Sequence, residues 1–387
     1  MSKERRESLD LDSATARAKS NTKTMERLQA AVKEDPDVNL LDFIPKTYLR
    51  SWLRKEELTD RPQPLPIKLP YAEPDFCAGL AARARTATIA HPLSTETISC
   101  LIVHLDSSSS AEDVTSNQCL VSALKHLILN SEKLCELPTR GVVLKCSDHL
   151  VAKIIRGNDD YTEYTSLQYL QDNAPALLAP KPHGLVKLND VHIIFMTYIP
   201  SVTLEQVWGT LTHDNKLLIQ SQLDEMFVKL RLLSHDSQCL GGVRGEGVKV
   251  DGAYGAQLHK KGISTAEDFD NFCFSAVSHR ASTSWVNFVR SLLPAWEDNF
   301  VFSHGDLRPA NIMVTPGEGG NYVLSGVIDW EDSGFYPDYF ESRQLLYTFG
   351  MGSEDDWYAY LPPSISPATH PQRWLVGRIW RYTLERC

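Results

Sequence analysis

The stretch from Val301 to Trp330 constrains the fold more than any other part of the chain. It reads VFSHGDLRPANIMV, continues through a Gly-rich turn, and ends in a second apolar run closed by VIDW. Two strand-like runs thus flank a polar loop that carries Asp306 and, five positions later, Asn311, while Asp329 ends the second run. Because Pro309 restricts the loop backbone, we expect these three side chains to point into one cavity.

These three side chains are the groups that a phosphoryl-transfer site requires. In the kinase arrangement, a loop Asp accepts the proton of the attacking hydroxyl, and an Asn and a second Asp bind Mg²⁺ beside the nucleotide phosphates. Taken singly, Asp306 also reads as a turn former, Asp329 as a strand-end cap and His304 as a core histidine. Their combination and order favour the catalytic interpretation.

The motif HGDLRPANI at residues 304–312, followed by IDWE at 328–331, resembles the catalytic and metal-binding segments of the aminoglycoside phosphotransferase family, in the form found in many fungal homologues. YPDYFE at 336–341 continues the likeness, which covers roughly residues 141–360. Protein kinases usually have Arg in place of Gly305, and Phe-Gly after the metal-binding Asp where this chain has Trp-Glu. The resemblance implies a two-lobed, protein-kinase-like α+β fold with a small β-rich N-lobe and a larger, mainly helical C-lobe.

The same resemblance implies an activity. We expect an ATP- and Mg²⁺-dependent phosphotransferase that phosphorylates a hydroxyl group of a small molecule. In this interpretation Asp306 orients and deprotonates the acceptor, and Asn311 and Asp329 hold Mg²⁺.

Two charged residues near these groups have more than one interpretation. Arg308 is placed to neutralise a nucleotide phosphate through a bidentate contact, but a structural pair with Glu331 or Asp332 explains it equally well. Glu331 is a candidate for a second metal site, and a salt-bridged or solvated role is the alternative.

Lys153 lies within the apolar run LVAKII at residues 150–155, where an ammonium group needs an anionic partner. In kinases a strand Lys contacts the nucleotide phosphates and pairs with a Glu on the following helix. Lys153 and Glu163 are our candidates for that pair, and a plain edge-strand lysine is the alternative. Three residues compete by position: Lys145, Asp159 and Asp160.

The segment after the strand-like run 191–196 is a candidate for the hinge between the lobes. We expect Thr197 and Tyr198 to lie where backbone groups would bind adenine, and a plain strand end is the alternative. No G-x-G-x-x-G motif precedes Lys153, so the sequence identifies no phosphate-binding loop residue.

We expect four segments along the chain. Residues 1–64 form an N-terminal tail with short helices, one of them around residues 40–53. Residues 65–118 form an irregular insertion that includes the tract Ser107–Ser110. Residues 119–200 form the N-lobe up to the hinge, and residues 201–387 form the helical C-lobe with the catalytic and metal-binding loops.

Several elements inside the lobes can be predicted from periodicity. Residues 141–146 and 150–155 read as a β-hairpin, residues 161–170 as a helix and residues 374–384 as another helix. The longest helix carries an apolar stripe at helical spacing: Ile219, Leu223, Met226, Leu230 and Leu233.

Composition restricts the partners. The formal net charge of −10 argues against a nucleic-acid partner, which needs a basic surface. No apolar run approaches the ~18 residues of a membrane span, and the charged start from Lys3 to Glu7 is unlike a secretory signal. The eight cysteines form no C-x-x-C pair, so neither a zinc site nor a disulfide framework is indicated. We therefore expect a cytoplasmic protein without membrane association.

Two other function classes remain open on the sequence. A noncatalytic pseudokinase is favoured by the irregular residues 65–118 and the missing glycine loop, but is opposed by the complete set of Asp306, Asn311 and Asp329. A protein kinase is opposed by Gly305 and by the absence of an Ala-Pro-Glu segment downstream.

Overall fold

The computed structural model describes residues 16–34, 75–105, 116–137, 140–157, 160–234, 239–251, 257–275, 281–295, 299–345 and 356–386. The chain forms two compact units, residues 1–71 and residues 72–387. In the first unit, helix α1 spans Ala16–Glu34. The helix predicted around residues 40–53 lies outside the described residues, and the division into four segments stays a prediction.

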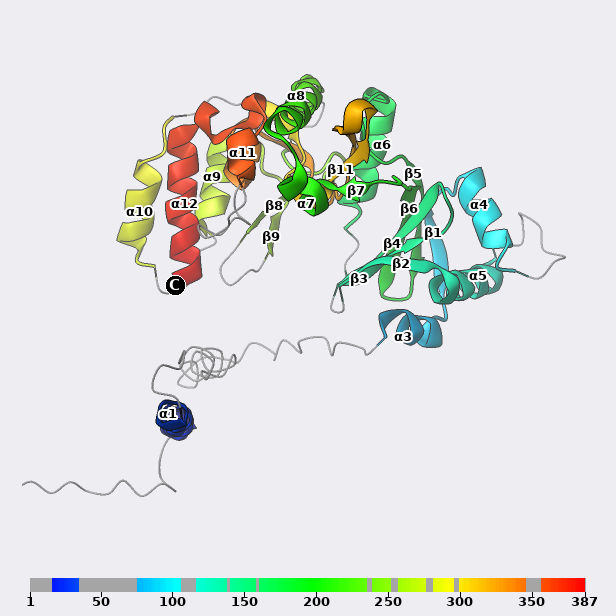
Figure 1. Cartoon of the computed structure of the whole chain (residues 1–387), viewed down its shortest axis with the longest axis horizontal. Coiled ribbons are helices and arrows are strands. Elements are labelled where there is room, and N and C mark those ends of the chain that lie inside the picture. Colours follow the sequence, from blue (N-terminus) through cyan, green and yellow to red (C-terminus); the bar gives the residue numbers. More distant parts are fainter. Residues whose placement is uncertain are drawn as a thin grey trace, which may run out of the picture. The chain divides into compact units, whose positions relative to one another are not determined.

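The second unit contains an antiparallel six-stranded sheet with the order β1-β5-β6-β4-β3-β2. Its strands are β1 (Ala87–His91), β2 (Glu132–Leu137), β3 (Gly141–Lys145), β4 (Leu150–Arg156), β5 (Pro182–Leu188) and β6 (Val191–Thr197). The predicted hairpin is confirmed, since β3 pairs with β4 and Val143 lies opposite Lys153. This sheet is the core of the N-lobe (Figure 1).

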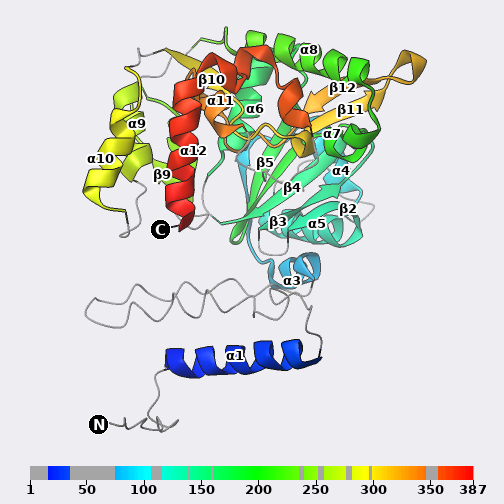
Figure 2. The same cartoon turned by 60° about the vertical axis from the view of Figure 1, so that its left-hand side comes forward.

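Both faces of the sheet are apolar, because side chains alternate along each strand and both sides are covered. Helices α3 (Phe76–Arg83), α4 (Thr95–Ile102) and α5 (Asn117–Asn130) cover one face, where Leu124 and Phe195 belong to one buried cluster. On the other face, Val151 and Ile194 share a cluster with α6 (Thr162–Asn173) and with C-lobe residues such as Ile312. Figures 1 and 2 show the sheet between these layers.

The expectation of an irregular segment at residues 65–118 is wrong for residues 76–102, which form α3, β1 and α4. Strand β1 joins the sheet by pairing with β5, where Ala87 lies opposite Leu188. Only Ala87 of this short edge strand is buried, so its sequence lacks an apolar alternation. Its partner lies far along the chain, which a local pattern does not reveal. The Ser107–Ser110 tract lies outside the described residues.

The C-lobe is mainly helical. Its α-helices are α7 (Leu204–Val207), α8 (His213–Leu230), α9 (Ala266–Ser275), α10 (Thr283–Ser291), α11 (Phe340–Gln344) and α12 (Pro371–Arg386). The predicted long helix is confirmed as α8, in which Ile219, Leu223, Met226 and Leu230 are buried. Thr212 caps its start by accepting the N–H of Asn215 at 3.2 Å. The two lobes confirm the predicted kinase-like α+β fold.

Two small sheets hold the predicted polar loop. Strand β10 (Phe300–Ser303) pairs with β13 (Gly334–Pro337), and β11 (Ile312–Pro316) pairs with β12 (Tyr322–Val327) and β7 (Val202–Thr203). A separate hairpin joins β8 (Val248–Asp251) to β9 (Gln257–Lys260). The loop with Asp306 and Asn311 connects β10 to β11, and Asp329 follows β12. The strand, loop and strand order read from the sequence is therefore confirmed.

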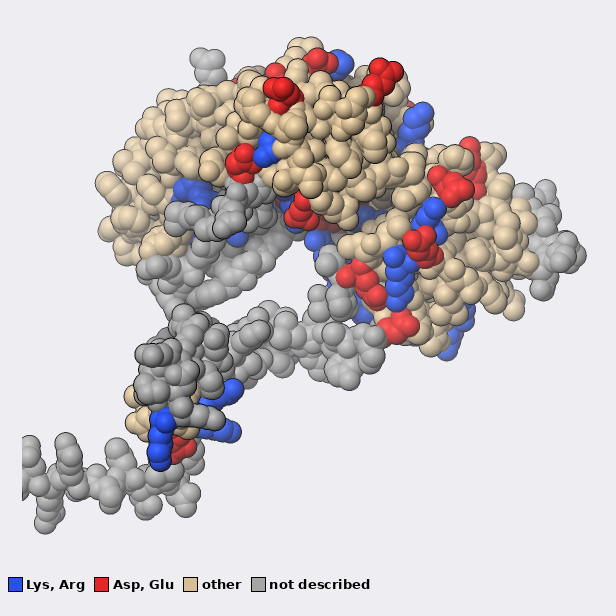
Figure 3. Space-filling view, in the orientation of Figure 1, with Lys and Arg blue, Asp and Glu red and all other residues tan. Residues whose placement is uncertain are grey.

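On the surface shown in Figure 3, acidic and basic side chains of the N-lobe lie next to one another. Lys133 illustrates this pattern, because its ammonium pairs with Asp75 at 3.2 Å and with Glu136 at 3.0 Å. Within the described ranges, no helix has both the length and the apolar character needed to cross a bilayer.

Candidate active site

The start of the polar loop is held by backbone contacts that require Gly305. This glycine has φ +87°, a left-handed conformation that other residues rarely adopt. A Cβ atom at this position would lie 2.5 Å from the carbonyl oxygen of Asp332. The close approach brings the polar loop against the segment that follows Asp329, so the two loops of the site touch through their backbones.

Glu341 of α11 anchors the same turn from inside the C-lobe. Its Oε2 accepts the N–H groups of His304 at 2.7 Å and of Gly305 at 3.2 Å. The side chain is only 1% exposed, and burial raises the pKa of Glu341. In the sequence, Glu341 appeared only as part of a family pattern, and no local feature indicated this role.

His304 is a structural residue of the loop. Its Nδ1 accepts the N–H of Asp306 at 3.2 Å, so its Nε2 is the atom that donates to the carbonyl of Ile328 at 3.0 Å. Burial lowers the pKa of His304, which favours the neutral ring that these two hydrogen bonds require. The interpretation of His304 as a core histidine is in agreement with this geometry.

Asp306 and Asn311 lie together, as the spacing predicted. The Asn311 amide nitrogen donates to the carboxylate of Asp306 at 3.0 Å and to its backbone carbonyl at 2.9 Å. Burial raises the pKa of Asp306, although Arg308 acts in the opposite direction. Arg308 pairs with Asp306 at 3.1 Å and approaches Asp329 at 4.0 Å. Its acidic neighbours are therefore these two carboxylates, and not the alternatives considered from the sequence.

Lys153 and Glu163 also lie together, and they meet Asp329. The Lys153 ammonium is 2.6 Å from Glu163, 2.5 Å from Asp329 and 3.5 Å from Glu331. Burial alone would lower the pKa of Lys153, but the three carboxylates outweigh it and raise that pKa. Burial raises the pKa of Glu163 to about 7, whereas Lys153 holds the pKa of Asp329 below its usual value. Lys153 favours the ionised form of both carboxylates, and at Glu163 burial outweighs this effect.

The described residues that compete by position with Lys153 and Glu163 have other partners. Lys145 binds Asp148 at 3.0 Å, and Asp160 binds Lys249 at 2.7 Å. Asp159 lies outside the described residues.

Asp329 adopts a left-handed backbone conformation with φ +69°. This turn follows β12 and brings Glu331 back to the same ammonium group of Lys153. Such conformations cost free energy and tend to occur at functional sites. They are tolerated best by Gly, Asn and Asp, which is in accord with the residue found here.

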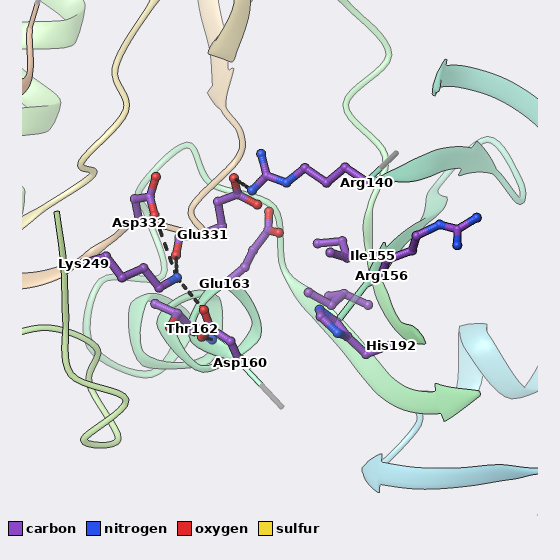
Figure 4. Close-up of a pocket in the computed structure, with 11 residues that line it drawn as sticks. Arg140, Ile155, Arg156, Asp160, Thr162, Glu163, His192, Lys249, Glu331 and Asp332 are labelled. Atoms are coloured by element: carbon purple, nitrogen blue, oxygen red, sulfur yellow. Dashed lines mark hydrogen bonds and ion pairs between the residues drawn. The ribbon is translucent and has the colours of Figure 1, made fainter. Parts of the chain in front are cut away.

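Two basic residues of the site were missed in the sequence. The guanidinium of Arg140 pairs with the carboxylate of Glu331. Lys249 is 7% exposed; its ammonium donates to the carbonyl of Glu331 and lies 3.8 Å from Asp332. Figure 4 shows Arg140 and Lys249 reaching Glu331 from different elements. A lysine within the apolar run VKV at 248–250 could have indicated a buried ammonium at Lys249, whereas no local feature of the sequence points to Arg140.

Two cavities border this group of charges. The larger, of about 190 Å³, is lined by Arg140, Ile155, Arg156, Asp160, Thr162, Glu163, His192, Ile194, Lys249, Glu331 and Asp332. The smaller, of about 60 Å³, is lined by Cys135, Arg140, Gly141, Val142, Val143, Lys153, Ile154, Ile155, Asp329 and Glu331. Arg140 and Glu331 line both cavities, so their ion pair lies at the boundary between them.

The oxygen donors of the site suit a magnesium ion. Carboxylate oxygens of Glu163, Asp329 and Glu331 all lie within 4.8 Å of one another. Among the residues described, no donor reaches Oδ1 of Asn311, whose amide nitrogen is taken by Asp306. Oxygen-only donor sets of carboxylates and amides are those that Mg²⁺ prefers.

The predicted hinge residues lie at the end of β6, where Thr197 is its last residue and Tyr198 comes directly after it. The N–H of Thr197 donates to the carbonyl of Lys181 and that of Tyr198 to the carbonyl of His149, both at 2.9 Å. Neither N–H can therefore bind a base without losing an internal hydrogen bond. The next residue, Ile199, has an N–H with no backbone acceptor in the described part of the chain.

Comparisons with known proteins identify the family of the chain. The model of a family described as the phosphotransferase enzyme family matches residues 149–362, which is more than half of the chain. None of the curated proteins matches the chain significantly.

Several solved structures are similar to the chain at low identity. An apo thermostable mutant of aminoglycoside phosphotransferase APH(4)-Ia has 15% identity and a TM-score of 0.43, covering 66% of this chain and 83% of that one. The gentamicin complex of APH(2")-IIa has 14% identity and a TM-score of 0.40, covering 62% and 77%. APH(3'')-Id from Streptomyces rimosus has 10% identity and a TM-score of 0.38, covering 66% and 93%.

Proposed function

The chain belongs to the phosphotransferase enzyme family, and we propose that it transfers the γ-phosphoryl group of ATP, with Mg²⁺, to a hydroxyl group of a small molecule. One observation carries the proposal. Asp306 and Asn311 of the loop after β10, Asp329 after β12 and Lys153 of β4 meet at one site, where Lys153 lies 2.5 Å from Asp329 and Arg308 contacts both Asp306 and Asp329. These are the groups that phosphoryl transfer by a kinase requires.

Asp306 is the proposed base. It would accept the proton of the acceptor hydroxyl, and the rise of its pKa through burial brings it closer to the working pH of a general base. The hydrogen bond from the Asn311 amide fixes the direction of this carboxylate at 3.0 Å. The anchor from Glu341 to His304 and Gly305 holds the backbone behind it. Orientation of the acceptor is then built into the loop before substrate arrives.

Asn311 and Asp329 are the proposed metal ligands, and Glu331 is a further carboxylate within reach of the same site. Mg²⁺, when bound, would offset negative charge on the transferring phosphoryl group. Lys153 would bind the nucleotide phosphates, and Glu163, 2.6 Å away, would hold its ammonium in place. Arg308 would add a second positive charge near Asp306, which it contacts at 3.1 Å.

The base-binding segment is proposed to be the stretch around Thr197 and Tyr198, with the N–H of Ile199 as its remaining donor. A cytoplasmic location is part of the proposal, because ATP is the phosphoryl donor and the described cysteines are free thiols, as is usual in reducing compartments.

The test is a screen for the acceptor with a matched inactive variant. The purified protein is incubated with a metabolite extract, ATP and Mg²⁺, and products that gain the mass of one phosphate are sought. Asp306→Asn keeps the size of the side chain and an oxygen acceptor for Asn311 but removes the charge. We expect its turnover to fall by about 10² or more, with Mg·ATP affinity close to that of the wild type.

Near wild-type turnover in Asp306→Asn would contradict the assigned base. A wild-type protein that binds Mg·ATP but phosphorylates no acceptor in a broad screen would favour the noncatalytic alternative.

A further inference from the structure

The hairpin of β2 and β3 occupies the place where kinase folds carry the glycine-rich loop that covers the nucleotide phosphates. In this chain the residues between the two strands are Pro138, Thr139 and Arg140. Proline has no N–H to offer a phosphate, and no glycine run precedes β3. The glycines that allow a kinase backbone to lie close to the phosphates are therefore missing from the sequence, so a side chain is a candidate to bind the phosphates here.

Gly141 has a steric role in this hairpin. A Cβ atom at this position would lie 2.0 Å from the carbonyl oxygen of Ile154 on β4, so only glycine permits this strand spacing. The carbonyl of the preceding residue, Arg140, accepts the N–H of Arg156 at 2.8 Å. The backbone at Arg140 is thereby fixed against β4, the strand that carries Lys153.

From this fixed point, the Arg140 side chain extends to the proposed phosphate site. Its guanidinium pairs with Glu331 (Figure 4). The Glu331 carboxylate in turn lies 3.5 Å from the Lys153 ammonium. Arg140, Lys153 and Asp329 line the same small cavity. Two cations on neighbouring strands, Arg140 before β3 and Lys153 on β4, thus reach one group of carboxylates.

A nucleotide polyphosphate bound at this site would need an additional cation, because carboxylates outnumber cations around it. Four carboxylates, those of Glu163, Asp306, Asp329 and Glu331, face three cations, those of Lys153, Arg140 and Arg308, while the fourth cation of the site, Lys249, pairs with Asp160 at 2.7 Å. In the part of the chain that the structure describes, Lys153 has three acidic partners and Arg308 has two, whereas Arg140 pairs with one.

Arg140 can also leave its ion pair with Glu331 for a phosphate at little cost in free energy. The Arg140 side chain is 55% exposed and that of Glu331 17%, so water competes mainly for the guanidinium, and an ion pair with one exposed partner contributes little to stability. A guanidinium can bind phosphate oxygens through two parallel hydrogen bonds, whereas here a single nitrogen of Arg140, Nη2, pairs with one oxygen of Glu331, Oε1.

We propose that Arg140 binds the nucleotide phosphates and that its side chain replaces the backbone contacts of the absent glycine-rich loop. Without nucleotide, Glu331 holds the guanidinium near the site. With nucleotide, Arg140 turns to the phosphate oxygens and Glu331 becomes free to approach the metal. This role rests on the proposed function, because it assigns a further residue to the same nucleotide site.

The experiment compares ligands that differ only in their phosphates. Calorimetric affinities for adenosine, AMP, ADP and ATP, each with Mg²⁺, are measured for the wild type, Arg140→Met and Arg140→Lys. For Arg140→Met we expect ATP and ADP affinity to fall about tenfold or more, the effect of one lost charge-assisted contact. Adenosine affinity should stay within about twofold, because in this proposal Arg140 contacts the phosphates alone. Arg140→Lys keeps the positive charge but loses the forked guanidinium group. Its ATP and ADP affinities should therefore lie between those of the wild type and those of Arg140→Met.

Arg85→Met is the matched control. Arg85 is an exposed arginine of the N-lobe that lines neither cavity, and its guanidinium donates to the carbonyls of Ala82 and Ala84, both at 2.8 Å. Its removal should leave the wild-type order of affinities unchanged. Urea unfolding of each variant verifies that the N-lobe is folded.

The outcomes separate the two proposals. If Arg140→Met keeps the wild-type gain from adenosine to ATP, or loses adenosine and ATP affinity equally, the role of Arg140 is overturned while the proposed function stands. If the wild type itself binds Mg·ATP no better than adenosine, the proposed function fails, and the role of Arg140 fails with it.

Discussion

Replacing Gly305 by alanine is expected to destabilise the protein strongly and to slow the proposed phosphoryl transfer. Two separate costs contribute. An L-residue in the left-handed region costs about 1–2 kcal/mol, and Gly305 has φ +87°. The added Cβ would also lie 2.5 Å from the carbonyl oxygen of Asp332, a backbone atom that cannot move away by changing rotamer. Overpacking of this kind typically costs about 1–3 kcal/mol.

The expected loss for Gly305→Ala is therefore about 2–5 kcal/mol, a large part of the roughly 5–15 kcal/mol that stabilises a typical domain. Gly319 provides the matched control. It has a similar φ of +71°, but a Cβ there would meet no heavy atom within 4 Å. Gly319→Ala should thus lose only about 1–2 kcal/mol, the cost of its backbone conformation.

Urea unfolding of both variants measures the two losses, and their difference isolates the contact between the polar loop and Asp332. Turnover is measured on the same preparations with an acceptor found in the screen. Gly305→Ala should be slower, because the loop that carries Asp306 must move away from the segment after Asp329. Equal losses of stability, within about 0.5 kcal/mol, would refute the steric argument.

Two further predictions concern the charges around this loop. Asp329→Asn should abolish the part of ATP affinity that depends on Mg²⁺, while the fold is retained because Asn tolerates φ +69°. Titrations of ATP with Mg²⁺ and with EDTA test this prediction. If the difference between the two affinities stays as large as in the wild type, Asp329 is not a metal ligand. Since burial lowers the pKa of His304 in the folded protein, the unfolded chain binds the proton more readily, and stability should fall as the pH drops below about 6.5. His304→Gln, which can make similar hydrogen bonds without titrating, should show a smaller decrease in unfolding free energy between pH 7 and pH 5, and identical profiles would exclude His304 as the source.

The parts of the site that the sequence predicted depend on short distances along the chain. Asp306 and Asn311 share one loop, and Lys153 and Glu163 belong to one strand and the helix that follows it. Residue type also contributed to the prediction of the Lys153–Glu163 pair, since a lysine in an apolar strand requires an acidic partner. The predicted side chains lie together in the structure, and their roles in catalysis stay a proposal.

The residues that were missed depend on contacts between distant parts of the chain. Arg140 and Glu331 are 191 positions apart, Lys249 and Glu331 are 82 apart, and Glu341 lies 37 positions after His304. Hydrophobic periodicity predicts which face of a helix or strand is buried, but it does not predict which charged residues from distant parts of the chain form ion pairs. Strand β1 escaped notice for the same reason, because pairing with β5 and not its own composition defines it.

The pairing of β1 with β5 also sets an order of events during synthesis. Strand β1 and helices α3, α4 and α5 leave the ribosome well before β5 and β6, the strands that they cover. Until Thr197 has emerged, Leu124 and Leu127 of α5 have no completed sheet to pack against. Non-local pairing of this kind folds slowly and leaves apolar surface exposed to other chains. The lobe that carries Lys153 is therefore expected to form late and in one cooperative step, so a pause in translation just after β6 would favour folding more than a pause before β5.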